Sequence, residues 1–237
     1  MFFSIFIGLF AIALLVGFFL LENSKKSAEK SIQDQSGHVV NATTNIRSKF
    51  ADNTISIDDK ANSVADYIGT LNSSIDDMCN KQLGLIYFVY SSQYQKCKDS
   101  IDALRIFRDT TVQLSEFLKE DMLLSATIPS VSSNLTYQQS YELWSNSLVA
   151  LEAVSVNDRL DTTKTALKSA ITAHRDDWKA LIDADAIRDK DAFNGAKDAI
   201  SSSYTTLIQV SDIQTKSLIE LQEKFNSDYQ SFLTQTN

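Results

Sequence analysis

An uncharged apolar run near the start of the sequence constrains the fold of this chain more than any other feature. Residues 2–21 contain no Asp, Glu, Lys or Arg, and only Ser4, Gly8 and Gly17 interrupt the apolar side chains. A helix of about 20 residues is about 30 Å long, which matches the hydrocarbon core of a bilayer. The sequence therefore predicts a membrane anchor bounded by Phe2 and Leu21, with the later residues on one side of the bilayer.

A cleaved signal peptide is the alternative interpretation of this run. Signal peptides carry a basic segment first, then an apolar stretch of about 7–15 residues and a small-residue cleavage site. Here no Lys or Arg precedes the run, the run is longer, and Leu20-Leu21-Glu22 does not resemble such a site. These differences favour a retained, single-pass signal-anchor.

Two patterns in the sequence favour opposite sides of the membrane for the chain after the anchor. Lys25, Lys26 and Lys30 come directly after the anchor, and by the positive-inside rule they favour the cytoplasm. Two cysteines and a chain rich in Ser, Thr, Asn and Asp favour the outside. Three fragments also fit the glycosylation acceptor pattern, at Asn41, Asn72 and Asn134. We expect the bulk of the chain to be extracytoplasmic.

Turn-forming residues are scarce, which indicates long helices. The chain of 237 residues has one proline and six glycines, whereas proteins rich in strands need such residues at short intervals. Apolar residues at alternating spacings of four and three form a coiled-coil-type seam at Ile57, Ala61, Val64, Ile68, Leu71, Ile75 and Met78. Ser56 and Asp59 form a capping pair at its start.

Similar patterns predict four more helices, and together they set the fold class. They cover about residues 97–118, 137–151, 158–181 and 191–233. Thr136 and Gln139 suit a cap for the second of these, and Asn157 and Asp158 mark the start of the third. Pro129 lies in a loop, and residues 183–190 form a turn. The chain is predicted to be all-α, with an N-terminal transmembrane helix followed by an elongated antiparallel bundle of four to five long helices with coiled-coil-like seams. The expected domains are an anchor at 1–22, a juxtamembrane stalk or linker at 23–54 and the helical bundle at 55–237.

The two cysteines allow two geometries. If residues 57–118 formed one helix, Cys79 and Cys97 would lie about 27 Å apart, too far to bond. If the chain reverses near Phe88, the two residues face each other across a helical hairpin and a disulfide can form.

The segment between the cysteines has the densest apolar run after the anchor. Residues 83–90 read Leu-Gly-Leu-Ile-Tyr-Phe-Val-Tyr, which is too short to span a membrane. Its large side chains suit either a buried core or an apolar tip that contacts a partner, and the tip residues are Leu85, Ile86, Tyr87, Phe88 and Tyr90.

The sequence does not predict catalysis, a metal site or a cofactor. His174 and Asp177 lie three residues apart on one helix, but two ligands are too few to hold a metal ion. Di-iron bundles require a Glu three residues before a His, and neither His38 nor His174 has one. Phosphate-loop and nucleophile motifs are absent from the sequence. A net charge of −8 argues against nucleic acid as a partner. We expect no enzyme activity and interpret His174 as part of an apolar stripe beside Trp178.

Three functions remain open. The first is a structural or protein-interaction component of a cell-envelope assembly. Such a protein would be bound to the bilayer through residues 2–21, and to an unknown protein or a second copy of itself. Polar residues at the seam positions Thr111, Ser211 and Gln214 suit contacts with partner helices. The second is an accessory sensory or ligand-binding module, since the architecture is broadly similar to the periplasmic domains of bacterial chemoreceptors. The third is a coiled-coil adaptor on the cytoplasmic side.

Overall fold

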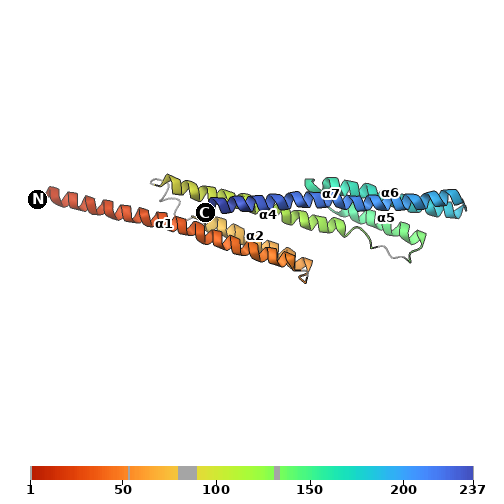
Figure 1. The fold of residues 1–237 in the computed structure, drawn as a ribbon, viewed down its shortest axis with the longest axis horizontal. Helices are drawn as coiled ribbons and strands as arrows, with labels where there is room; N and C mark the ends of the chain where they lie inside the picture. The colour runs from red at the N-terminus through yellow and green to blue at the C-terminus, as the bar shows by residue number, and fades with distance from the viewer. Residues whose placement is uncertain (1, 53, 80–89, 131–133, 237) are drawn as a thin grey trace. The chain divides into compact units, whose positions relative to one another are not determined.

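The protein is all-α in a computed structural model that describes residues 2–52, 54–79, 90–130 and 134–236 (Figure 1). These residues form six helices and no strand. The helices are α1 (Phe2–Ala51), α2 (Ile57–Asp77), α4 (Ser91–Ser125), α5 (Tyr137–Ala153), α6 (Asp158–Ala186) and α7 (Lys190–Thr236). The predicted all-α class is confirmed.

Side-chain caps begin three of these helices at points where the sequence predicts a helix start. The Ser56 hydroxyl accepts the backbone N–H of Asp59 at 3.1 Å and caps α2. Thr136 and Gln139 form a reciprocal capping box at the start of α5. Asn157 caps α6 through its side-chain oxygen. Each cap satisfies an N–H group that has no partner within its helix.

The helices pack into two compact units. Unit 1 consists of Met1–Val112 with Glu223–Asn237, and unit 2 of Gln113–Gln222. The core of unit 1 takes residues from α1, α2, α4 and α7, and helices α1 and α2 lie side by side in it (Figure 1). Its largest fully buried side chains are Leu71, Met78, Leu104, Phe107 and Phe232.

Residues 23–51 belong to the core of unit 1. Helix α1 continues through Gly37 without a break, and Ile32, Val39 and Ile46 are at most 8% exposed. This packing differs from the stalk or linker predicted for residues 23–54. The seam is polar, but its hydroxyl groups find partners on other helices: Thr43 bonds to Tyr67 on α2, and Ser36 bonds to the end of α7.

Unit 2 has its own core, which draws on α4, α5, α6 and α7. Its buried apolar side chains include Phe117, Leu124, Trp144, Leu151, Leu160, Leu167, Ile171, Leu207 and Val210. Helix α6 ends at Ala186 and α7 begins at Lys190, so the turn predicted over 183–190 is shorter in the structure. Arg188 adopts the left-handed conformation in this turn, with φ of 56°.

Among the residues that the structure describes, no helical stretch is both long enough and apolar enough to cross a bilayer. The side chains of residues 2–15 and 17, Phe2 among them, lie outside the described part of the chain. The membrane anchor over residues 2–21 therefore stays a prediction.

Candidate functional site

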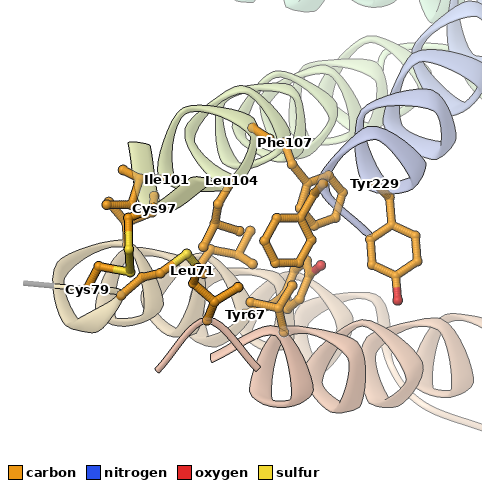
Figure 2. Close-up of a cluster of buried hydrophobic side chains, with 14 of the residues drawn as sticks. Tyr67, Leu71, Cys79, Cys97, Ile101, Leu104, Phe107 and Tyr229 are labelled. Atoms are coloured by element: carbon orange, nitrogen blue, oxygen red, sulfur yellow. A yellow bond between two sulfur atoms is a disulfide. The ribbon is translucent and has the colours of Figure 1, made fainter. Parts of the chain in front are cut away.

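A disulfide joins the end of α2 to the beginning of α4. Cys79 and Cys97 are fully buried, and their Cα atoms lie 6.0 Å apart (Figure 2). Of the two geometries that the sequence allows, the structure has the one with two separate helices, since α2 ends at Asp77 and α4 begins at Ser91. The bond therefore clamps α2 and α4 together at one end of unit 1.

Helix α1 contacts this clamp through a small hydroxyl group. Cys79 is in the left-handed region, with φ of 58°, a conformation that is unfavourable for a residue with a Cβ atom. Its backbone N–H donates to Ser31 Oγ at 3.1 Å, and Ser31 Oγ donates to the carbonyl of Asp77 at 3.4 Å. Ala28, one turn earlier on α1, is buried in the same cluster. Ser31 thus links α1 to the C-terminus of α2.

Tyr90 contacts α1 one residue beyond Leu21, where the apolar run ends. Its hydroxyl donates to Glu22 Oε2 at 3.3 Å, and Lys25 Nζ lies 5.8 Å from the centre of its ring. The tyrosine is half-buried against the core of unit 1. The other predicted tip residues, Leu85, Ile86, Tyr87 and Phe88, lie outside the described residues.

An aromatic cluster fixes the C-terminal part of α7 in unit 1. Figure 2 shows Phe107 on α4 beside Tyr67 and Tyr229. The centre of the Phe107 ring lies 6.4 Å from that of Tyr67, 4.9 Å from that of Phe225 and 5.3 Å from that of Tyr229. The guanidinium of Arg47 lies 5.2 Å from the ring of Tyr229. These contacts tie α1, α2, α4 and α7 to one another.

A buried pair of hydroxyl groups lies beside this cluster. Thr43 Oγ1 donates to the carbonyl of Val39 at 2.7 Å, so the Tyr67 hydroxyl is the donor in the 2.6 Å bond between Tyr67 and Thr43. Burial raises the pKa of Tyr67 well above its usual value of 10.0. The phenol therefore stays neutral, and it acts here as a structural donor.

His174 is buried in unit 2 among three aromatic rings. Its ring lies 4.6 Å from that of Trp144 on α5, 6.2 Å from Trp178 and 5.8 Å from Tyr204 on α7. Nδ1 lies 2.8 Å from Ser203 Oγ and Nε2 lies 3.1 Å from Trp178 Nε1, so both nitrogens have partners within unit 2. His174 therefore lies beside Trp178, as the sequence predicts. The charge of Asp177 acts on the imidazole and partly opposes the lowering of the His174 pKa that burial causes.

Polar residues in the predicted seams also have partners within their units. Gln214 donates to Asp121 Oδ1 at 2.8 Å, and Thr111 donates to the carbonyl of Phe107 at 2.9 Å. Burial raises the pKa of the Asp121 carboxyl, and the hydrogen bond from Gln214 partly opposes this shift. The side chain of Ser211, the third such position, lies outside the described part.

Within the described residues, no group of three or more His, Cys, Asp or Glu side chains is placed to hold a metal ion. No family model, curated protein or solved structure matches this chain. Its function is therefore inferred from its own residues.

Two hydroxyl residues that organise these sites were missed by sequence reasoning. Ser31 and Ser203 each lie on a helix face between buried apolar residues, but the pattern alone does not tell which buried group a serine meets. Ser31 meets a backbone N–H that lies 48 residues away, and Ser203 meets an imidazole 29 residues away.

Proposed function

We propose that this chain is a single-pass membrane protein whose helical bundle is an extracytoplasmic structural or protein-interaction component of a cell-envelope assembly. The observation that carries the anchoring is the exposure of Phe18, Phe19 and Leu20 on α1, at 65%, 68% and 60%. Successive residues on an α-helix point about 100° apart, so these three side chains face different directions. One neighbouring helix does not cover all three, whereas lipid surrounds a helix completely.

The anchor and unit 1 share one continuous helix. Ala28, the first buried residue of the unit 1 core along α1, lies seven residues beyond Leu21, or about 10 Å along a helix that rises 1.5 Å per residue. This continuity supports a bundle held close to the bilayer, with no long linker between the membrane and the core.

The disulfide supports an extracytoplasmic position. Structural disulfides persist in oxidising compartments and are rare in the cytosol, where thiols are kept reduced. The lysines that follow the anchor favour the opposite orientation, which is that of the cytoplasmic adaptor. We give the disulfide more weight because both of its cysteines are buried in the core of unit 1. The positive charge of the three lysines, in contrast, is partly offset by Glu22 and Glu29.

A stripe of exposed apolar side chains on α7 supports a protein-interaction role in unit 2. Tyr204, Ile208 and Ile219 are 48%, 57% and 47% exposed. Their spacing places all three within about 60° of one another around the helix. Sedimentation of the detergent-solubilised chain, with and without Ile208→Lys, tests whether a second copy binds there. A mass that is monomeric in both forms would contradict self-association through this stripe.

Two experiments on the full chain test the anchor and its orientation. Extraction of membranes with alkaline carbonate should leave the protein in the pellet, and its release would overturn the anchor. Both native cysteines are bonded, so Ser169→Cys at an exposed position of α6 adds a single reactive thiol. A membrane-impermeant maleimide should label this variant on intact cells. Labelling only after permeabilisation would favour the cytoplasmic adaptor.

A further inference from the structure

Tyr90 brings the disulfide-linked end of unit 1 next to the point where the predicted anchor ends. The tyrosine lies 68 residues beyond Glu22 in the sequence, yet its hydroxyl donates to the Glu22 carboxylate at 3.3 Å. Lys25, the next residue on the same face of α1, lies over the tyrosine ring. Two separate contacts therefore hold the start of α4 against the first turn of α1 after Leu21.

The height of this cluster above the bilayer follows from the continuity of α1. Glu22 is one residue beyond Leu21, and Lys25 is four residues beyond it, or about 6 Å along the helix axis. The headgroup layer of each leaflet is about 5–8 Å thick. If residues 2–21 fill the hydrocarbon core, Glu22, Lys25 and Tyr90 lie at the level of the lipid headgroups.

The chemistry of the cluster fits that level. Tyrosine combines an apolar ring with a polar hydroxyl and is enriched at membrane–water interfaces. A lysine near the end of a membrane helix extends its amine towards the phosphates while its methylene groups cover apolar surface. Lys26, exposed beside Lys25, adds a second amine at the same height. The cluster therefore combines an aromatic ring and two cations with one carboxylate, that of Glu22, which accepts the tyrosine hydroxyl.

We infer that Tyr90, with Lys25 and Lys26, forms a second contact of unit 1 with the lipid headgroups, beside the anchor. The inference rests on the proposed anchoring. The partner is the bilayer surface itself. Such a contact holds the start of α4 against the membrane, and the disulfide links α4 to the end of α2, so that unit 1 does not tilt freely about a single helix.

Photocrosslinking to lipid tests this contact in the full chain. Benzoylphenylalanine replaces Phe19, Tyr90 or Phe50 in turn, and each variant is irradiated in phosphatidylcholine nanodiscs and analysed by mass spectrometry for lipid adducts. Phe50 is the matched control, because it is an aromatic residue of α1, 39% exposed and about 43 Å beyond Leu21 at 1.5 Å per residue. We expect lipid adducts at positions 19 and 90 and none at position 50.

The other outcomes separate the two proposals. An adduct at 19 without one at 90 would overturn the headgroup contact and leave the anchor intact. Failure to crosslink at 19 would overturn the anchor, and the headgroup contact with it. An adduct at 50 would mean that α1 lies along the membrane, which contradicts the geometry of the inference.

A second measurement uses the native side chain, because the label at position 90 removes the bond to Glu22. Unmodified protein is irradiated in nanodiscs that contain a phosphatidylcholine with a diazirine near the headgroup. The peptide that carries Tyr90 should be labelled and the peptide that carries Phe50 should not. An unlabelled Tyr90 peptide would overturn the contact.

Discussion

The indole N–H of Trp178 donates to Nε2 of His174 at 3.1 Å, and this bond requires the imidazole to be neutral. With Nε2 accepting, Nδ1 carries the proton and donates to Ser203 Oγ at 2.8 Å. The Ser203 hydroxyl in turn donates to the carbonyl of Ile200 at 3.2 Å. A proton on Nε2 would place two N–H donors against each other inside unit 2.

The first prediction is that unit 2 loses stability as the pH falls below the usual His pKa of 6.5. Burial lowers the pKa of His174 in the folded protein. Asp177 on α6 and the carbonyl of Ile200 on α7 oppose this shift. From α5, the uncharged ring of Trp144 packs against the imidazole. As the pH falls, His174 therefore takes up its proton in the unfolded chain before it does so in the folded protein. Its contribution to the free energy of unfolding is complete above pH 6.5. It declines as the pH falls towards the lower folded-state pKa, by at most about 1.4 kcal/mol per pH unit.

Tryptophan fluorescence measures this effect selectively, because both tryptophans of the chain, Trp144 and Trp178, lie in unit 2. Urea unfolding is followed at pH 7.5 and pH 5.0 for the native chain, for His174→Gln and for His38→Gln. The native chain and His38→Gln, which changes an exposed histidine, should lose the same stability at pH 5.0. His174→Gln should lose less. An equal loss in all three would contradict the assignment.

The second prediction concerns the disulfide. Replacing both Cys79 and Cys97 by serine should destabilise unit 1 by about 3 kcal/mol, since the bond closes a loop with a sequence separation of 18 residues. Hydrogen exchange of the α2 amides, measured by mass spectrometry, should become faster. The tryptophan fluorescence of unit 2 serves as the internal control and should not change. Unchanged exchange in α2 would show that the bond contributes little.

Local patterns predicted the helices because the forces that start a helix act within a few residues. The caps at Ser56, Thr136 and Asn157 join groups at most three residues apart, so they are visible in the sequence. The 57–78 seam depends only on the helical repeat, and it identifies Val64 and Leu71 as core. Fold class and most helix boundaries follow from interactions of this range.

Interactions between distant residues could not be predicted in the same way. Nothing within residues 57–118 decides whether the chain reverses, so the sequence left the disulfide open. The polar seam of residues 23–54 gave no sign that Thr43 would meet Tyr67 or that Ser36 would meet Thr236, which lies 200 residues away. For His174, the sequence indicated its neighbour Trp178, one helical turn away, but not Ser203 on another helix.

The third prediction uses the Thr43–Tyr67 pair. Tyr67→Phe removes one hydrogen bond but leaves Thr43 bonded to the Val39 carbonyl, so we expect a loss of about 1 kcal/mol. Thr43→Val leaves the Tyr67 hydroxyl buried without a partner, which costs about 1–3 kcal/mol. The double variant should be no less stable than Thr43→Val alone, because both polar groups are then gone. Hydrogen exchange in α2 measures the three variants, and a more damaging Tyr67→Phe would reverse the argument.

The fourth prediction is that Thr163→Val stabilises unit 2. Thr163 on α6 is completely buried, and its hydroxyl has no hydrogen-bond partner within the described structure. Valine has the same branched shape, so the substitution removes an unpaired polar atom without opening a cavity. We expect a gain of about 1–3 kcal/mol. Thr165→Val, at an exposed position of the same helix, is the matched control and should change stability by less than about 0.5 kcal/mol. If urea unfolding followed by tryptophan fluorescence shows Thr163→Val to be destabilised, the hydroxyl has a partner in solution, such as a buried water.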